Sequence, residues 1–464
     1  MSGLILLIAL AAVCVVWVAL SMTSPVTDEA TPRLRDPRLR ITAGLLWLIG
    51  LAPIAIGLVG TPATELEGTL QNQSSGAAGA VGEIANGVTF VVCVVLLSWG
   101  LMSRARRNWS PVAVGAVVFF FATAAAAFFG TQPAFYRGVL LVPLAVLTFL
   151  VIPMGDLEWF MPRVKRILLM YVYSALVLAV VWPAKVLLTG YASVFGLPAV
   201  RLIGLVFQGN ILGPIAAFSF FVVLRSPRTS LRWVHLGASG LVLFLAQGKA
   251  AWIATVIGLL FVWAYGPATT SGRKLRLAGI SLVLLFVMVQ ATSPATQQRL
   301  ESYSTTGQDF ETLNGRTFVW DETLKVWQDN PWFGYGPTLW SEQFRAQYGQ
   351  AFAFAGQAHN QFIQSLGESG LVGLAGLIVY VLAMLYAAVK SAPRTGGLTM
   401  ALFSLLAIRL VTEAALRTYR IDASFMFHIL LTYTLMVGWH DSQEALEPAG
   451  GREPDRAEPA VVAA

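Results

Sequence analysis

The chain has 464 residues, of which 56% are hydrophobic and only 12% are charged, and its mean hydropathy is +0.68. This composition excludes an ordinary soluble globular protein and is typical of a protein that crosses a membrane many times. The formal net charge is +7. The basic residues form short clusters between apolar runs, which indicates membrane topology and no nucleic-acid partner.

Apolar runs recur along the whole chain, and most are close to the ~20 residues that a helix needs to cross the hydrocarbon core. Examples are residues 4–21, 277–289 and 371–389. The first run lacks a basic preceding region, so we interpret it as a retained helix and not as a signal peptide. The sequence predicts an all-α integral membrane protein with about 12–13 transmembrane helices.

The basic clusters predict the orientation of these helices, because lysine and arginine in short loops are retained on the cytoplasmic side. Six clusters lie near residues 33–40, 104–107, 163–166, 225–232, 273–276 and 390–394. The connectors between them are expected to face outward, with the N-terminus outside and the tail from Asp441 inside.

Three regions are expected along the chain. Residues 1–190 form N-terminal transmembrane helices, residues 191–440 form a catalytic transmembrane region, and residues 441–464 form a disordered cytoplasmic tail. The catalytic region contains a long outer loop, residues 293–358, which bears amphipathic helices. This loop is acidic, with seven Asp and Glu against four Lys and Arg, so a cation in it is not part of a generally basic surface.

Among the residues that carry, or can carry, positive charge on the predicted outer side, four are of particular interest: Arg201, Lys249, Arg316 and His359. A simpler interpretation of such residues is that they anchor a helix end at the lipid headgroups. Anchoring is the favoured interpretation for a second set at helix ends, which comprises Arg137, Lys185, Arg417 and Arg420. Arg201 opens a glycine-containing segment that leads to Asn210, and Lys249 lies in a hairpin between two spans.

Arg316 stands at the start of a predicted amphipathic helix. Asn314 is a plausible N-cap, Trp320, Leu324 and Trp327 form an apolar stripe, and the helix is expected to end before Asn330-Pro331. An arginine at this position can meet an anion together with the free backbone N–H groups of the first turn. The alternative is a solvated charge on a loop helix.

His359 and Asn360 open the next span, and Glu368 follows about 13 Å further along the helix axis. Arginine binds phosphate oxygens through two N–H groups, and an imidazole near neutral pKa can take a proton from an attacking hydroxyl. The combination suits group transfer from a lipid-linked pyrophosphate without a metal or another cofactor. For Glu368, a hydrogen-bonding role within the bundle competes with substrate binding.

Four motifs follow one another in this part of the chain: Arg201-x-x-Gly204 with Asn210, Gly315-Arg316-x-x-x-Trp320, Pro331-x-x-Gly334-x-Gly336, and His359-Asn360 with Glu368-x-Gly370. Together they resemble the O-antigen ligase and O-antigen polymerase superfamily. The resemblance covers about residues 201–373, and the earlier spans match only in being apolar.

The resemblance implies a metal-independent, inverting glycosyltransferase of the bacterial inner membrane, with its active site facing the periplasm. The implied donor is a glycan on undecaprenyl pyrophosphate, and the acceptor is another glycan or lipid A–core, in contact with membrane lipids. Arg201, Arg316 and His359 then match the essential residues. Asn210, Lys249, Trp320, Asn360 and Glu368 are expected to bind substrate. The family often has Ser-Arg where this chain has Gly248-Lys249.

Two other functions stay open from the residues. A lipid-linked oligosaccharide transporter would also use many spans, but its charges belong near the midplane of broken helices. A metal-dependent transferase would need acidic ligands, and the nearest pair, Asp156 and Glu158, falls in a predicted cytoplasmic loop. Arg409 and Glu413, four residues apart within a span, are interpreted as a buried structural ion pair. The sequence does not separate ligase from polymerase.

Overall fold

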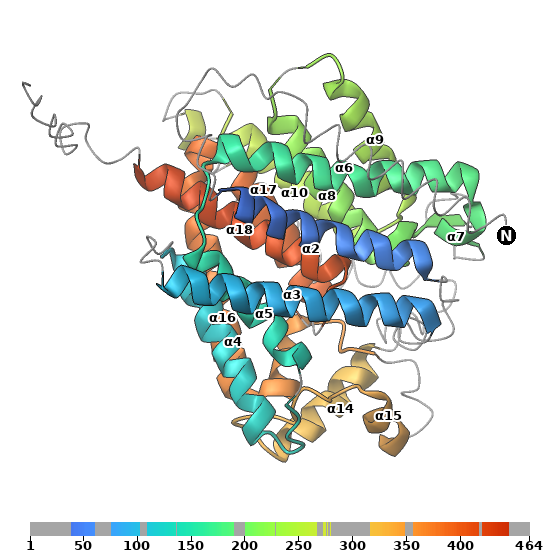
Figure 1. Ribbon diagram of the computed structural model, residues 1–464, viewed down its shortest axis with the longest axis vertical. Coiled ribbons are helices and arrows are strands. Elements are labelled where there is room, and N and C mark those ends of the chain that lie inside the picture. Colours follow the sequence, from blue (N-terminus) through green and yellow to red (C-terminus); the bar gives the residue numbers. More distant parts are fainter. Residues whose placement is uncertain are drawn as a thin grey trace, which may run out of the picture.

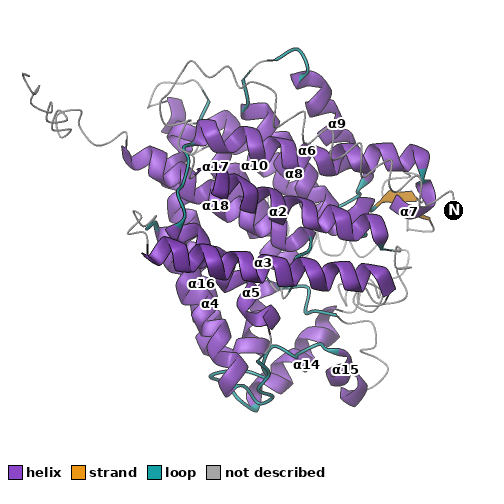
Figure 2. Cartoon of the chain, in the orientation of Figure 1, coloured by secondary structure: helices purple, strands orange, loops and turns teal. Residues whose placement is uncertain are grey.

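The computed structural model describes residues 39–60, 76–102, 109–135, 137–189, 200–227, 229–266, 316–348, 356–416 and 420–444, with positions 272–274, 276 and 279. Within these ranges the chain is almost entirely helical (Figure 1, Figure 2). The prediction of an all-α membrane protein is therefore confirmed. The apolar runs 4–21 and 277–289 lie outside the described residues, so the count of 12–13 spans stays a prediction.

Among the described residues, five helices are long and apolar enough to cross a membrane. They are α2 (Leu39–Val59), α3 (Gly76–Met102, apolar from Ala80), α4 (Pro111–Phe129), α6 (Leu157–Val181) and α16 (Gln361–Thr395). Shorter apolar helices complete the bundle: α5 (Arg137–Val151), α8 (Gly209–Arg225), α9 (Arg232–Leu245), α10 (Lys249–Ala264) and α17 (Leu398–Thr412). The last helix is α18 (Ala423–Glu444).

The remaining elements are short and lie at helix ends. They are α7 (Pro183–Val186), strands β1 (Leu187–Thr189) and β2 (Val200–Leu202), the 3-10 helix η2 (Gly204–Val206), α14 (Arg316–Gln328) and α15 (Glu342–Tyr348). The strands pair antiparallel with Leu188 opposite Arg201. The sequence did not predict this small sheet, which Figure 2 shows in orange beside α7.

Side-chain caps fix where several helices begin. The Ser110 hydroxyl accepts a hydrogen bond from the Ala113 N–H, and Pro111 occupies the first turn of α4, where a missing N–H costs nothing. Asp156 caps α6 in the same way through the Trp159 N–H. The acidic pair considered for a metal thus includes a residue that is used as a helix cap.

Small residues allow α4 and α16 to pack closely along their length. A Cβ atom on Gly115 would lie 2.8 Å from the Ala383 Cβ, and one on Gly376 would lie 3.0 Å from the Ala122 Cβ. Close backbone approach at small residues is a common way for helices to associate in lipid, where burial of apolar surface drives nothing. The functional site lies at the start of α16.

Helix α16 is broken at Gly370, whose φ of 61° lies in the left-handed region. The loop 331–336 fills the break with backbone hydrogen bonds. The N–H groups of Tyr335 and Gly336 donate to the carbonyls of Gly367 and Glu368 at 2.8 and 3.0 Å, and the Leu371 N–H donates to the Pro331 carbonyl at 2.9 Å. The polar backbone freed by the break is thus satisfied within the protein, as a bilayer interior demands.

The helices place two sets of residues at opposite ends of the bundle. Helices α8, α10 and α16 begin at one end, where α9 and α17 finish. The opposite end carries the basic residues: Arg225 ends α8, Arg232 begins α9, and Arg394 is in the last turn of α16. Contacts hold this basic end together, because Arg232 donates to the Leu224 carbonyl and Arg394 to the Asp441 carbonyl, both at 2.7 Å.

Lys185 has a different role from the predicted lipid anchor. It is buried, and its ammonium donates to the carbonyls of Leu58 and Gly60 at 2.6 and 2.9 Å. These carbonyls lie at the C-terminus of α2, where the last four lack intrahelical donors. Lys185 is therefore a helix cap. Arg420 forms an ion pair with Asp422 at 3.8 Å, whereas Arg417 and the Arg137 side chain lie outside the described residues.

Candidate functional site

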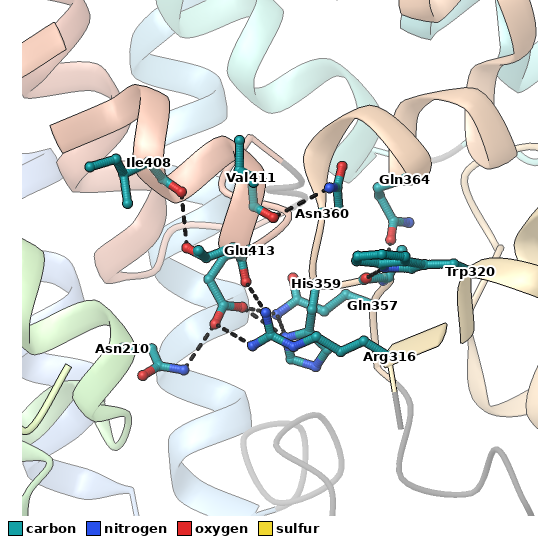
Figure 3. A network of polar contacts seen from close by, with 12 residues as sticks. Asn210, Arg316, Trp320, Gln357, His359, Asn360, Gln364, Ile408, Val411 and Glu413 are labelled. Carbon is teal, nitrogen blue, oxygen red and sulfur yellow. Dashed lines mark hydrogen bonds and ion pairs between the residues drawn. The ribbon is translucent and has the colours of Figure 1, made fainter. Parts of the chain in front are cut away.

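The ends of several helices converge on one carboxylate, Glu413, which directly follows α17 (Figure 3). Its Oε2 accepts hydrogen bonds from His359 Nδ1 and Gln357 Nε2, both at 2.9 Å. Its Oε1 accepts one from Asn210 Nδ2 at 2.9 Å and lies 3.9 Å from the Arg316 guanidinium. Glu413 therefore joins the starts of α8, α14 and α16.

His359 is held in an unusual backbone conformation, with φ of 48°. A non-glycine residue in the left-handed region is strained and persists only where its surroundings determine it. Its Nδ1 lies next to the Glu413 carboxylate. Because a carboxylate can only accept a hydrogen bond, Nδ1 is the nitrogen that carries the proton. With Nδ1 as the donor, Nε2 of the neutral ring is unprotonated and can accept a proton.

Arg316 is the first residue of α14, and its side chain is 28% exposed. Its Nη1 donates to the Thr412 carbonyl at 3.0 Å, while Nη2 faces Glu413. Because Thr412 is the last residue of α17, this contact fastens the outer helix to the membrane bundle. The predicted end of the helix before Asn330-Pro331 is confirmed, since α14 ends at Gln328.

Arg201 lies behind Asn210 and is only 5% exposed. Its Nε donates to the Ala246 carbonyl at 2.8 Å, and its Nη2 donates to Asn210 Oδ1. Asn210 therefore connects Arg201 to Glu413. The guanidinium packs against Gly209, where a Cβ atom would lie 2.2 Å from the Arg201 Nε. The cation, the amide and the carboxylate form one hydrogen-bonded chain.

Lys249 begins α10 in the turn that supplies the Ala246 carbonyl. Its side chain is exposed and forms no hydrogen bond or ion pair with any residue that the structure describes. Gln247 in the same turn donates to the Val200 carbonyl at 2.9 Å, which ties the turn to β2. The ammonium is thus at the site's end of the bundle without belonging to its network.

Trp320 and Asn360 hold the segment that carries His359. The Trp320 indole N–H donates to the Ala358 carbonyl at 2.7 Å. Asn360 caps α16, because its Oδ1 accepts from the N–H groups of Phe362 and Ile363. Its Nδ2 donates to the Val411 carbonyl at 3.3 Å. Both side chains were expected to bind substrate, and in the structure they position the histidine.

Glu368 is 5% exposed and lies on α16 about two turns beyond Gln361. Gln361 accepts from the Leu416 N–H at 2.7 Å and donates to the Ser365 hydroxyl at 3.0 Å. Glu368 lines a small pocket between α4, α5 and α16 together with Thr123 and Ser369. The structure therefore brings together Arg201, Asn210, Arg316 and His359, but it does not bring Glu368 to them.

Glu413 is the central residue that sequence reasoning missed. Its pairing with Arg409 was inferred from their spacing of four residues, but the structure has no ion pair between them. Glu413 is no longer helical, with φ of −149° and ψ of 159°, so its side chain turns from the helix face toward His359. The signal available in the sequence was an acidic residue at the end of a span.

The charge of Glu413 is set by its neighbours. Burial raises the pKa of this carboxyl, whereas the hydrogen bond from His359 and the charges of His359, Arg316 and Arg409 lower it, and the net pKa is below the ordinary value. The carboxyl is thus ionised at neutral pH. Within the described residues, no three His, Cys, Asp or Glu side chains converge as metal ligands would. The side chains nearest Glu413 are an imidazole, two amides and a guanidinium.

The fold and the site define a multi-pass membrane protein with an arginine, a histidine and a carboxylate gathered at one end of its bundle. Residues 234–378 match the model of the family described as O-antigen ligase, which supports the O-antigen ligase and polymerase superfamily. The match includes Lys249, Arg316 and His359. Arg201, Asn210 and Glu413 lie outside it and enter the site only through the fold.

One relative is a protein of Haemophilus influenzae described as uncharacterized. The two chains are 24% identical over 207 residues, which is 40% of this chain and 51% of that protein. The chain therefore spans about half the length of the relative it matches.

Proposed function

We propose that this protein is a glycosyltransferase of the ligase or polymerase type that uses a glycan on a polyprenyl pyrophosphate, with undecaprenyl pyrophosphate as the donor lipid. One observation carries the proposal: Arg316 and His359 both contact Glu413, at the end of the bundle that is opposite the basic clusters. Basic clusters stay on the cytoplasmic side, so the site faces the periplasm of the inner membrane.

In the proposed reaction Arg316 binds the diphosphate through two N–H groups, and Lys249 adds positive charge at the wet edge of the site. Arg201, which is buried behind Asn210, contributes its charge and holds Asn210 in place. These cations stabilise the negative charge that develops on the leaving group, so the reaction needs no metal.

His359 acts as the general base. Nε2 takes the proton of the acceptor hydroxyl while the hydroxyl oxygen attacks the anomeric carbon from the side opposite the diphosphate. The bond between the anomeric carbon and the diphosphate oxygen breaks, and the polyprenyl diphosphate leaves with the electron pair. Glu413 fixes the Nδ1–H tautomer and stabilises the imidazolium, as the carboxylate does in a Ser-His-Asp triad.

The proposal separates binding from chemistry in two variants. Arg316→Lys keeps the charge but loses the planar fork. Losing this contact should cost about 2–4 kcal/mol of transition-state stabilisation, so single turnover should slow roughly a hundredfold or more. His359→Ala should abolish turnover and leave donor affinity nearly unchanged. Both quantities are measured on purified protein in lipid nanodiscs with a lipid-linked glycan and excess chelator.

Three results would contradict this proposal. Loss of donor binding in His359→Ala equal to that in Arg316→Ala would make the histidine a phosphate ligand. Activity that vanishes in chelator and returns with magnesium would favour a metal-dependent transferase. Translocation of the lipid-linked glycan without new glycosidic bonds would favour a transporter. Deletion of the gene then identifies the acceptor, because unattached long chains indicate a ligase and single repeats indicate a polymerase.

A further inference from the structure

Arg409 is a buried arginine without a hydrogen-bond acceptor in the part of the chain that the structure describes. It is in the last turn of α17 and is 3% exposed. Its Nε and Nη1 have no partner, and its guanidinium carbon lies 4.7 Å from the centre of the Phe427 ring. A buried, fully charged group that lacks acceptors is costly in a bundle at membrane depth, so its presence calls for a reason.

The group that best accounts for a buried charge at Arg409 is Glu413, which follows Arg409 by about one helical turn. The Glu413 N–H donates to the Arg409 carbonyl at 2.7 Å. The carboxylate itself faces the other way, toward His359, Gln357, Asn210 and Arg316 (Figure 3). The Arg409 guanidinium instead packs on Phe427 of α18, and its positive charge acts on Glu413 without an ion pair between the two side chains.

Other charged groups around this pair are accounted for. Arg316 comes from α14 and His359 from the start of α16, and Arg201 is behind Asn210. On the α18 side, Asp422 pairs with Arg420 at 3.8 Å and its charge also acts on Arg409, though less than that of Glu413 does, and His428 Nε2 lies 2.9 Å from the Tyr380 hydroxyl. Arg409 is buried, and unlike Arg316 and Arg201 it forms no hydrogen bond or ion pair with the described side chains of the site.

Binding of the donor changes the balance of charge at Glu413. The diphosphate binds the Arg316 guanidinium and brings negative charge close to the carboxylate, which favours protonation of Glu413. A protonated Glu413 no longer holds the His359 Nδ1–H as an anion does, and the base loses its orientation. A fixed positive charge close to the carboxylate keeps Glu413 ionised and so prevents this loss of orientation.

We propose that Arg409 is a positioning residue, which keeps Glu413 ionised while the donor diphosphate occupies Arg316 and so keeps His359 in its base-competent tautomer. The inference rests on the proposed function, because it needs a diphosphate in the site. It gives a reason for a charge that forms no hydrogen bond of its own.

The test measures how donor affinity depends on pH. The probe is a farnesyl-diphosphate-linked monosaccharide, whose diphosphate is esterified at both ends and does not titrate near neutrality. Its affinity is measured between about pH 6 and pH 8 for the full chain in nanodiscs. In Arg409→Met, Glu413 should take up a proton when the probe binds, so affinity should weaken as the pH rises, by up to ~10-fold per pH unit.

Three controls separate this effect from a structural one. Wild type and Arg409→Lys, which keeps the positive charge, should show no such slope. The double variant Arg409→Met/Glu413→Gln should lose the slope, because the group that takes up the proton is gone. A purely structural arginine would change the affinity at all pH values alike.

The outcomes distinguish this inference from the proposed function. If the probe does not bind wild type at any pH, the proposed function fails. If the probe binds and Arg409→Met has the same slope as wild type, the role of Arg409 is refuted and the proposed function stands. Should Arg409→Met not fold, the double variant decides, since removing the Glu413 charge should restore folding. A double variant that still fails to fold would overturn the inference.

Discussion

At the scale of single residues, the site depends on Glu413 as much as on the cations. Its two oxygens accept hydrogen bonds from His359, Gln357 and Asn210, and it forms an ion pair with Arg316. These four partners come from three separate parts of the chain, since His359 and Gln357 belong to one segment. A change confined to the charge of this carboxyl is therefore the most direct test of the network.

Glu413→Gln should lower turnover by roughly 10²–10³-fold, because an amide neither fixes the tautomer of His359 nor stabilises the imidazolium. Donor affinity should stay the same or rise, since a negative charge beside the diphosphate is removed. Single-turnover rates measure the loss of turnover, and a donor-binding assay measures the affinity. Asp321→Asn removes an exposed carboxylate of α14 as a control. Equal turnover in both variants would refute the role of Glu413.

The same carboxyl predicts a pH dependence of stability. A group whose pKa is lowered in the folded protein stabilises it above the pKa of the unfolded chain, and this contribution is lost as the pH falls through the lower folded value. Wild type should therefore lose thermal stability toward acid pH more steeply than Glu413→Gln. Unfolding temperatures in nanodiscs from neutral to acid pH measure the difference, and parallel curves would contradict it.

Gly209 offers a second test at the residue scale. Its Cβ would lie 2.2 Å from the Arg201 Nε and 2.7 Å from the Ala246 carbonyl, so Gly209→Ala should displace the guanidinium and reduce activity as Arg201→Ala does. The double variant should lose little more, because both changes act on one contact. Gly240→Ala, on α9, has open space around the added methyl and should behave as wild type. Additive losses in the double variant would count against this.

At the scale of elements, the loop 331–336 and the break in α16 hold the outer segment against the bundle. Arg316 precedes this loop and His359 precedes α16, so the docking sets the distance between the cation and the base. The connection between α4 and α5 also contacts the loop 331–336, because the Thr131 N–H donates a hydrogen bond to the Gly334 carbonyl at 2.9 Å. Three segments distant in sequence meet through backbone hydrogen bonds.

Gly370→Ala tests this docking. The added Cβ would lie 2.4 Å from the Trp332 carbonyl carbon and oxygen, at a φ of 61°. The strained conformation alone costs about 1–3 kcal/mol, and the clash adds to it. We expect a lower unfolding temperature, lower activity and faster proteolysis of the outer segment. Gly237→Ala, with open space on α9, is the control. Unchanged proteolysis would show that the loop does not depend on the break.

At the scale of the whole molecule, the two ends of the bundle differ in charge and in role. The end with Arg225, Arg232 and Arg394 is expected in the cytoplasm, and the end with the site is expected in the periplasm. Helices α8 and α16 begin at the site and carry Arg225 and Arg394 in their last turns at the basic end, and α17 runs the opposite way, from Leu398 to the site. The orientation of the site therefore follows from the orientation of the bundle.

Cysteine labelling checks this orientation in a background without Cys14 and Cys93. Cysteine at Gln328, which is exposed at the end of α14, should react with a membrane-impermeant thiol reagent in intact spheroplasts. Cysteine at Ser230, exposed between α8 and α9, should react only after permeabilisation. The reverse pattern would place the site in the cytoplasm and overturn the proposed function.

The sequence by itself determined the membrane class, the helical fold, and the cations and histidine that are unusual on the predicted outer side. These follow from composition, apolar run length and charge placement, which are local properties of the chain. It also predicted α14 and its end, because proline and glycine act locally.

The tertiary structure alone decided which of these residues meet. Arg201, Arg316 and His359 are far apart in sequence, and only the ends of packed helices bring them to Glu413. Spacing of four residues favoured an ion pair between Glu413 and Arg409, but the helix ends before Glu413 and its side chain turns outward. The cap formed by Lys185 was hidden for the same reason, because its carbonyl partners, Leu58 and Gly60, are distant in sequence and only packing brings them to the ammonium.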